Sequence, residues 1–401
     1  MDKTRKGRIV RVATAVWAGL GVLAAVGGPQ PSAALVARIA DEQADVIGIV
    51  HWGLNTFTDR EWGSGGEDPQ LLAPTDFSAD QIVGACKAGG IGGLVVVAKH
   101  HDGFCLWPTK TTDHNISKSP FRGGKGDYVG EMCAACRKAG LRFGVYCSPW
   151  DRNNAGYATE AYVKTYHAQV AELLDGRYGE IFEMWFDGAN GGSGWYGGAN
   201  ETRRIGDGYY RFDELFRTVR RLQPKACIFG MGGEFAWPGN ERGYVPDDRS
   251  PSDAKVQRLW EADFPLRKGW FYHQADTNTV RSGEFLMQRY LGTVGKGAIM
   301  DIGIAPDRRG RLADEDGAAL RRFGELRRAF FAHEVTDDGP FNLVVARDGL
   351  GLKRMTVTTD RLVAGRRYRV EARLLNRVMN ATTTNGETET AQWMTSGGKV
   401  K

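Results

Sequence analysis

The sequence IFEMWFDG at Ile181–Gly188 decides the fold of this chain. It begins as a short apolar run suited to a buried strand, and it ends in Trp185, Asp187 and Gly188. A short apolar run closed by a turn residue is typical of a parallel strand that is covered on both faces. In α/β barrels, the side chains at the carboxyl ends of such strands carry the chemistry. We therefore expect Asp187 to be a candidate nucleophile, although one strand alone leaves open that Asp187 only caps the following turn.

Predicted strands and helices alternate outward from this stretch in both directions. The other strands, expected from apolar runs, are Asp45–His51, Ile91–Ala98, Leu141–Cys147, Ala226–Gly230, Gly269–Ala275 and Ala298–Gly303. The helices, expected from amphipathic spacing and cap residues, are Ser78–Lys87, Tyr128–Lys138, Glu160–Leu174, Phe212–Leu222, Ser282–Thr293 and Asp314–Phe331. The stretch Trp260–Gly269 has no regular pattern, and we expect it to be irregular.

This alternation predicts an α/β fold built from parallel strand–helix units. The run from the first strand to the last helix is close to the roughly 250–300 residues of a (β/α)₈-like TIM barrel with insertions. Fewer than eight strands can be counted, so closure of the barrel is inferred, and a doubly wound open sheet is the alternative. No Gly-rich phosphate-binding sequence follows the first strand, which disfavours the nucleotide-binding version of that alternative.

The chain divides into three parts by composition. Residues 1–34 are expected to be a signal peptide, and residues 35–335 the barrel domain. Residues 340–401 are expected to form a small C-terminal β appendage, short for a complete β-sandwich. Within it, the strand-like runs Leu343–Ala346, Thr356–Thr359 and Tyr368–Ala372 lack helical periodicity.

The first residues have the pattern of an export signal. A cluster of Lys and Arg precedes the apolar run Val12–Val26, and Ser32-Ala33-Ala34 offers a small-residue cleavage site. The apolar run is too short for a comfortable membrane span, so an uncleaved anchor is the less favoured interpretation. We expect the mature protein to be exported to the periplasm or the medium, with no membrane association after cleavage.

Composition limits the other partners. The 401 residues are 42% hydrophobic and 25% charged, with a formal net charge of +5, which is ordinary for a soluble globular protein. Dense basic runs are confined to the first residues, so nucleic-acid binding is not expected. The pair Cys133 and Cys136 has CxxC spacing but lies in an amphipathic helix without a second ligand pair, which favours buried free thiols over a metal site.

Polar and aromatic side chains recur at the predicted strand ends, and this recurrence is the main functional signal. In chain order they are His51, His100, His101, Tyr146, Trp185, Asp187, and then Glu234 or Glu241. His100 and His101 are adjacent and are expected to point to opposite sides of the sheet, and no HExxH motif is present, so no metal is expected. Two carboxylates surrounded by aromatic rings and histidines suit glycoside hydrolysis, which needs a nucleophile or base and an acid.

Four segments together carry a resemblance to a known family. They are HWGLNTFTDREWG at residues 51–63, AKHHDGFCLWPTKTTDHN at 98–115, GVYCSPWDRN at 144–153 and EMWFDGAN at 183–190. In this order and spacing they resemble the α-L-fucosidases of glycoside hydrolase family 29, over about residues 47–330. The resemblance implies a (β/α)₈-like catalytic barrel, hydrolysis of terminal α-L-fucose with retention, and no cofactor. It implies that fucosylated oligosaccharides or glycoconjugates are the partners.

The resemblance also assigns roles to individual residues. It makes Asp187 the nucleophile that forms a covalent fucosyl-enzyme. It implies that the substrate-binding residues are His51, Trp52, Glu61, His100, His101, Tyr146, Trp185 and Trp270, with Trp62 beside Glu61 near the sugar. It places the acid/base at Glu241, because residues 237–243 (WPGNERG) match the W-x-G-N-E-x-G segment of the subgroup that prefers α-1,3/4-linked fucose. Glu234 is the runner-up for the acid/base.

Two other functions stay open at this point. One is a fucose-binding protein without catalysis, and the other is a hydrolase of the same fold that acts on another sugar. A retaining enzyme is expected to hold Asp187 and Glu241 about 5 Å apart. It also needs Glu241 protonated at the start, so we expect burial or a neighbouring acid to raise the pKa of Glu241, with Arg242 facing away.

Overall fold

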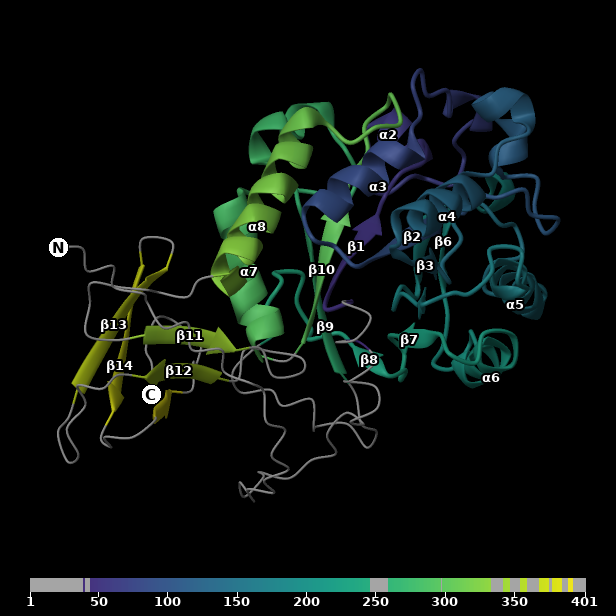
Figure 1. Ribbon diagram of the computed structural model, residues 1–401. Coiled ribbons are helices and arrows are strands. Elements are labelled where there is room, and N and C mark those ends of the chain that lie inside the picture. The colour runs from purple at the N-terminus through teal and green to yellow at the C-terminus, as the bar shows by residue number, and fades with distance from the viewer. Residues whose placement is uncertain are drawn as a thin grey trace, which may run out of the picture.

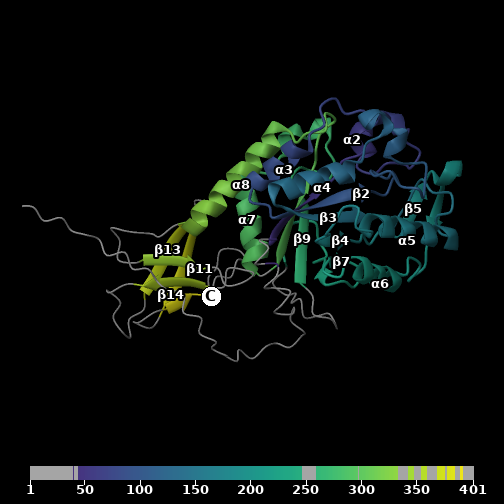
Figure 2. The ribbon, with the colours of Figure 1, turned by 45° about the vertical axis from the view of Figure 1, so that its right-hand side comes forward.

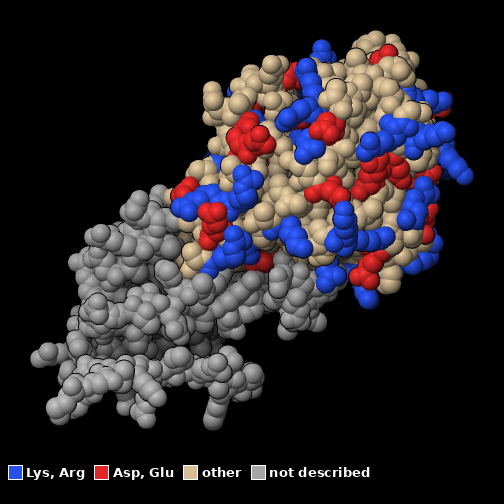
Figure 3. All heavy atoms as spheres, turned by 45° about the horizontal axis from the view of Figure 1, so that its top comes forward, with Lys and Arg blue, Asp and Glu red and all other residues tan. Residues whose placement is uncertain are grey.

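The computed structural model describes residues 39, 44–245, 259–296 and 298–332, together with the backbone of five strands between residues 342 and 391. The predicted signal peptide lies outside the described residues. No helix in the described ranges is long and apolar enough to cross a bilayer. On the face drawn in Figure 3, Lys and Arg side chains are interspersed with Asp and Glu, so the charges there do not form a continuous patch of one sign.

Eight strands close into a barrel in the order β1-β10-β9-β8-β7-β4-β3-β2, and every neighbouring pair is parallel (Figure 1). They are β1 (Val46–Val50), β2 (Gly93–Lys99), β3 (Arg142–Cys147), β4 (Glu183–Trp185), β7 (Cys227–Phe229), β8 (Phe235–Ala236), β9 (Leu259–Pro265) and β10 (Ile299–Ile304). The predicted barrel is therefore confirmed. The open doubly wound sheet is wrong, because the pairing of β1 with β10 closes the sheet.

Helices cover the outside of the barrel, as the two ribbon views show (Figures 1 and 2). They are α3 (Ala79–Ala88), α4 (Tyr128–Ala139), α5 (Glu160–Leu174), α6 (Phe212–Leu222), α7 (Gly283–Thr293) and α8 (Asp314–Ala332). The short helix α2 (Leu54–Thr58) follows β1 and lies at one end of the barrel. The side chains of Ser78, Asp127 and Ser282 accept the N–H groups that the first turns of α3, α4 and α7 leave free. These caps explain why the predicted helix boundaries agree closely with the observed ones.

Shorter elements complete the chain. An antiparallel hairpin, β5 (Gly191–Gly194) and β6 (Glu201–Arg204), follows β4. The 3₁₀ turns are η1 (Pro69–Leu71), η2 (Ile116–Lys118), η3 (Phe121–Gly124), η4 (Tyr196–Gly198), η6 (Gln274–Thr279) and η7 (Val294–Lys296). The C-terminal strands are β11 (Asn342–Ala346), β12 (Arg354–Thr358), β13 (Tyr368–Leu374), β14 (Arg377–Thr383) and β15 (Glu389–Ala391). They pair as β11-β12-β15 and β13-β14, so the three strand-like runs predicted in this region are observed as strands.

Two predictions of secondary structure are wrong, and both concern the chain between β8 and α7. Residues 260–265 were expected to be irregular but belong to the barrel strand β9. Its interior-facing positions include Glu261 and Asp263, which break the apolar run that a buried strand normally shows. The strand expected at Gly269–Ala275 is instead a series of bends that leads into η6.

Three acidic side chains lie in the interior of the barrel. Glu183, Glu261 and Asp301 are fully buried, and the indole N–H of Trp185 donates to Oε1 of Glu261 at 2.9 Å. Burial raises the pKa of each of the three carboxyl groups well above its usual range, and the charge of an acidic neighbour adds to the effect. We therefore expect these carboxyl groups to hold protons around neutral pH.

This arrangement predicts a pH-dependent stability. Because the pKa of Glu183 is higher in the folded than in the unfolded chain, its contribution is fully present below about pH 4 and is lost as pH rises through the folded pKa. Glu183→Gln stays neutral, so its free energy of unfolding relative to wild type should become more favourable with pH, by up to about 1.4 kcal/mol per pH unit. Urea unfolding at pH 4.5, 6 and 8 measures this difference.

The control for that experiment is Glu214→Gln, which changes an exposed carboxylate on α6. Its difference from wild type should stay nearly constant across the three pH values. A Glu183→Gln difference that is equally constant would contradict the protonated state of the interior acids.

Candidate active site

A cavity of about 590 Å³ is lined by the carboxyl ends of the barrel strands and the loops that follow them. This volume is in the range of sites for small molecules, about 300–1,000 Å³. Eight residues that the sequence predicted line the cavity together: His51, His100, His101, Tyr146, Trp185, Asp187, Glu241 and Trp270. The structure thus brings these eight side chains together at one cavity, where Trp62 joins them.

Asp187 lies two residues beyond β4, and both of its carboxylate oxygens accept hydrogen bonds. The hydroxyl of Tyr146 donates to Oδ2 at 2.9 Å, and the backbone N–H of Ala189 donates to Oδ1 at 2.7 Å. Burial and the charge of Asp187 raise the pKa of Tyr146 well above its usual range, so the phenol remains a donor. The two donors fix the orientation of the carboxylate against the cavity.

Glu241 lies on the segment between β8 and β9, exposed to solvent at the edge of the same cavity. Partial burial raises the pKa of its carboxyl group, and the charges of Asp187 and Glu61 raise it further, against the opposing effect of a hydrogen bond from the Trp270 side chain. The site thus pairs a carboxylate held by two donors with a carboxyl group whose pKa is raised above its usual value. Two neighbouring carboxyl groups with different pKa values can divide the work of a reaction, because one can act as the nucleophile or base and the other as the acid.

Three histidines line the cavity, and all are expected to be neutral. Burial lowers the pKa of His51 to about 3, and burial also lowers the pKa values of His100 and His101. The ring centroids of His100 and His101 are 4.1 Å apart. The expectation that these two side chains point to opposite sides is wrong, because β2 ends at Lys99 and the alternation of a strand does not continue beyond it.

Hydrogen bonds orient the histidine rings. Nδ1 of His101 lies 2.7 Å from the hydroxyl of Ser148, and Nδ1 of His100 lies 3.4 Å from the amide nitrogen of Asn55. No group of three or more His, Cys, Asp or Glu in the described residues has an arrangement that could hold a metal ion. As neutral rings in the cavity lining, the three histidines can both donate and accept hydrogen bonds to a polar ligand.

Aromatic rings form much of the wall. Trp185 stacks on Phe229 at a centroid distance of 3.9 Å, and Trp270 packs at 5.1 Å from His51. Trp62 and Trp150 meet edge to face at 5.9 Å. Flat apolar faces beside neutral hydrogen-bonding groups suit a ligand that has both C–H faces and hydroxyl groups.

Two predicted substrate-binding residues do not line the cavity. Trp52 is 1% exposed, stacks on Tyr128 at 5.0 Å and donates from Nε1 to the carbonyl oxygen of Asp307 at 3.0 Å. The structure thus contradicts a sugar contact for the Trp52 ring, because the ring is packed in the shell between barrel and helices. Glu61 accepts the backbone N–H groups of Trp270 and Phe271 at 2.5 and 3.3 Å, so it holds the chain that carries Trp270.

Glu234, the runner-up for the acid/base, also lies apart from the cavity lining. Its carboxylate forms an ion pair with Arg220 and accepts the backbone N–H of Ile228 at 2.9 Å. A carboxylate paired in this way is structural, and the geometry favours Glu241.

The sequence analysis gave no role to several residues of the cavity lining, among them three with large or charged side chains: Trp150, Arg152 and Asp263. Trp150 was visible near the end of the third predicted strand. Arg152 lies over the ring of Trp150, 5.1 Å from its centroid, and donates to the carbonyl oxygen of Ser193 at 2.6 Å. Asp263 ends the interior-facing series of β9, a strand that the sequence pattern did not show.

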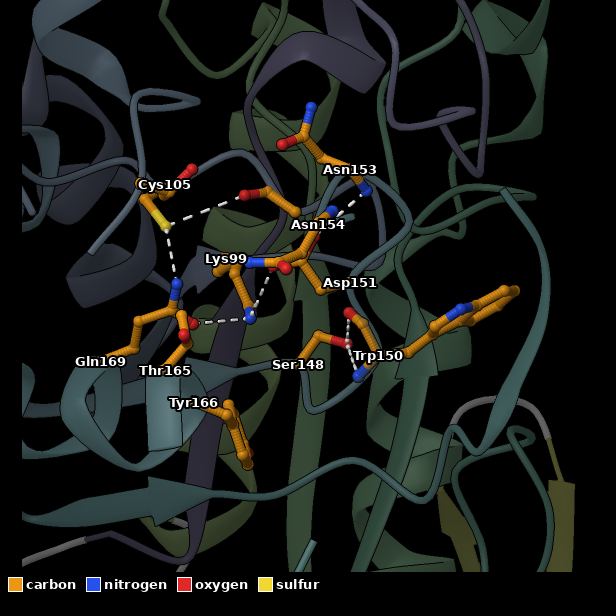
Figure 4. A network of polar contacts seen from close by, with 12 residues as sticks. Lys99, Cys105, Ser148, Trp150, Asp151, Asn153, Asn154, Thr165, Tyr166 and Gln169 are labelled. Carbon is orange, nitrogen blue, oxygen red and sulfur yellow. Dashed lines mark hydrogen bonds and ion pairs between the residues drawn. The ribbon is translucent and has the colours of Figure 1, made fainter. Parts of the chain in front are cut away.

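A network of polar contacts lies where β2 ends, next in the chain to His100 (Figure 4). Lys99, the last residue of β2, is fully buried, and its ammonium group donates to Oε1 of Gln169 at 2.7 Å. It also lies 3.5 Å from Oδ2 of Asp151, whose other oxygen accepts the N–H groups of Asn153 and Asn154. The network joins the chain before His100 to the loop that carries Trp150 and Arg152.

The comparisons with known proteins agree with one another. The family model described as "Alpha-L-fucosidase" matches residues 56–329. The chain is 34% identical over 346 residues to "Putative alpha-L-fucosidase 1" of Oryza sativa subsp. japonica, covering 80% of this chain and 63% of that protein. It is 34% identical over 310 residues to "Alpha-L-fucosidase 1" of Arabidopsis thaliana, covering 72% of this chain and 58% of that protein. The chain therefore spans less than two thirds of the length of these relatives.

The chain is also similar to a solved structure of a protein from this group of glycoside hydrolases. A glycoside hydrolase 29 family member from an unknown rumen bacterium is 33% identical, with a TM-score of 0.74 over 91% of this chain and 71% of that chain.

Proposed function

Because the chain belongs to the alpha-L-fucosidase family, we propose that it hydrolyses terminal α-L-fucosides with retention of configuration. The observation that carries the proposal is the placement of Asp187 and Glu241 in one cavity with three neutral histidines. Glycoside hydrolysis needs two such carboxyl groups in different protonation states.

In the first step of this proposal, the carboxylate of Asp187 attacks the anomeric carbon of the fucose. The bond from that carbon to the leaving-group oxygen breaks, and Glu241 gives its proton to the departing oxygen. The product is a β-linked fucosyl ester on Asp187. The hydrogen bonds from Tyr146 and Ala189 hold the carboxylate in the orientation that attack requires.

In the second step, Glu241 is ionised and takes a proton from a water molecule. That water attacks the anomeric carbon, the ester bond to Asp187 breaks, and α-L-fucose leaves. Two inversions give net retention, and the chemistry balances without a metal or an organic cofactor. The neutral histidines can donate to and accept from sugar hydroxyls without competing with Asp187 as the nucleophile.

The family and the WPGNERG segment at residues 237–243 support a narrower proposal about the substrate. We propose that the fucose is α-1,3/4-linked in a branched oligosaccharide or glycoconjugate, since that segment resembles the subgroup with this preference. The leader pattern of residues 1–34 supports export to the periplasm or the medium.

A substrate panel tests the proposed function. The purified protein is incubated with 4-nitrophenyl glycosides of α-L-fucose, β-D-galactose and α-L-rhamnose, and with α-1,2-, α-1,3- and α-1,4-linked fucosyl oligosaccharides. We expect hydrolysis of the fucosides alone, with the α-1,3 and α-1,4 linkages cleaved fastest. Nuclear magnetic resonance should detect α-L-fucose as the first product before mutarotation. Binding of fucose without turnover of any fucoside would favour a fucose-binding protein without catalysis. Turnover of the galactoside or the rhamnoside instead would favour a hydrolase of the same fold that acts on another sugar.

A further inference from the structure

A second acidic side chain stands beside Glu241 at the cavity. Asp263, near the carboxyl end of β9, is 4% exposed and lines the cavity together with Asp187 and Glu241. Its Oδ1 accepts the indole N–H of Trp237 at 2.8 Å, and its backbone carbonyl oxygen accepts the N–H of Gly243 at 3.1 Å. Asp263 thus binds the chain on both sides of Glu241.

The segment between these two anchors is a tight loop. Oδ1 of Asn240 accepts the backbone N–H of Arg242 at 3.1 Å, and the amide group of Asn240 donates to the carbonyl oxygen of Tyr244 at 3.3 Å. Gly243 has φ of +64°, and a Cβ atom there would lie 2.1 Å from Cδ1 of Phe264. The loop therefore packs directly on β9, and the strand determines where Glu241 stands.

We propose that Asp263, with Trp237 as its partner, is the positioning residue that holds Glu241 at the leaving-group oxygen. The inference rests on the proposed function, because it concerns the proton donor of that reaction. Burial raises the pKa of Asp263 to about 7, and the charge of Glu241 contributes to this shift. Around pH 6 Asp263 is thus mainly a neutral hydrogen-bonding group, which orients the loop without adding a negative charge beside Asp187.

The inference predicts a defect that depends on the leaving group. A sugar alkoxide needs a proton from the acid, whereas 4-nitrophenolate is a good leaving group without one. A displaced Glu241 should therefore slow the cleavage of a fucosyl disaccharide much more than the cleavage of 4-nitrophenyl α-L-fucoside. Loss of general stability would slow both substrates alike.

The test compares kcat/KM on these two substrates at pH 6 for four variants of the full chain. Asp263→Ala removes the acceptor for Trp237, Asp263→Asn keeps an acceptor oxygen, and Trp237→Phe removes the donor from an exposed side chain. Asp301→Ala is the matched control, because Asp301 is a buried acid that pairs with Asp263 in register across β9 and β10 but does not line the cavity.

For Asp263→Ala we expect a loss on the disaccharide at least about tenfold larger than the loss on the aryl fucoside. Trp237→Phe should show a smaller selective loss of the same direction, and Asp263→Asn should restore the wild-type ratio within about threefold. Asp301→Ala should leave the ratio unchanged whatever it does to stability. If Asp263→Ala does not fold, the ratio for Trp237→Phe decides.

Equal losses on both substrates for Asp263→Ala and Trp237→Phe, with an active wild type, would overturn the inference and leave the proposed function standing. A wild type that cleaves neither fucoside would overturn the proposed function, and the inference with it.

Discussion

Asp187→Ala is expected to lower kcat/KM for 4-nitrophenyl α-L-fucoside by about 10⁴-fold or more, the usual cost of removing a covalent nucleophile. The leaving group is activated, so the loss cannot be ascribed to missing proton donation. Asp187 accepts hydrogen bonds from Tyr146 and Ala189 and forms no ion pair in the described structure. Its removal should therefore leave the fold and the affinity for fucose largely intact. Initial-rate kinetics and calorimetric titration with fucose measure the two quantities.

Azide makes this experiment specific for the nucleophile. In Asp187→Ala, azide can occupy the space of the carboxylate and attack the α-fucoside directly. A single displacement inverts the anomeric carbon, so the expected product is β-L-fucosyl azide. A variant that retains activity within tenfold of wild type, or that yields only the α-azide, would show that another residue is the nucleophile.

The barrel could be predicted because its strands and helices carry local signals. Apolar runs identify β1, β2 and β3, and side-chain caps such as Ser78 mark where helices begin. Asp187 follows a strand of only three residues, β4, yet its position after an apolar run and before Gly188 was enough to place it at the rim. Local pattern and global fold agree at these places, which is typical of foldable sequences.

The missed features have physical causes of another kind. β9 carries Glu261 and Asp263 toward the barrel interior, and such acids are tolerated because they can hold protons, which no periodicity reveals. Trp52 directly follows a cavity residue, but its ring is directed to the outer shell by packing with Tyr128 and Phe77. The family resemblance assigned Trp52 to substrate binding, but a sequence match does not show the direction in which a side chain points. Tertiary packing decides that direction.

Arg152 illustrates the same limit for loops. It reaches the carbonyl oxygens of Gly63 and Ser193, so it joins segments that are far apart in the sequence at the rim of the cavity. The sequence supplied the residue and its neighbours Trp150 and Asp151, but the long-range contacts that make Arg152 part of the site exist only in the folded chain.

Glu241→Ala is expected to separate substrates by leaving group, with a loss of about 10²–10⁴-fold on a fucosyl disaccharide and a much smaller loss on 4-nitrophenyl α-L-fucoside. The pH profile supplies a second readout. Because the protonated form is the active acid, wild-type activity on the disaccharide should fall as pH rises through the pKa of Glu241, which burial and the charges of Asp187 and Glu61 raise. That alkaline decline should disappear in the variant.

Azide and a second glutamate provide the controls for Glu241. In Glu241→Ala the fucosyl ester on Asp187 still forms from the aryl substrate, and azide then replaces water as the attacking group. Two displacements give α-L-fucosyl azide, the opposite anomer to that expected from Asp187→Ala. Glu234→Ala removes a carboxylate that binds Arg220 and the Ile228 N–H instead of lining the cavity, so it should reduce stability and keep the wild-type ratio of the two substrates. If Glu234→Ala instead shows the selective loss and the α-azide while Glu241→Ala behaves as wild type, the acid/base is Glu234, and the segment at residues 237–243 has another role.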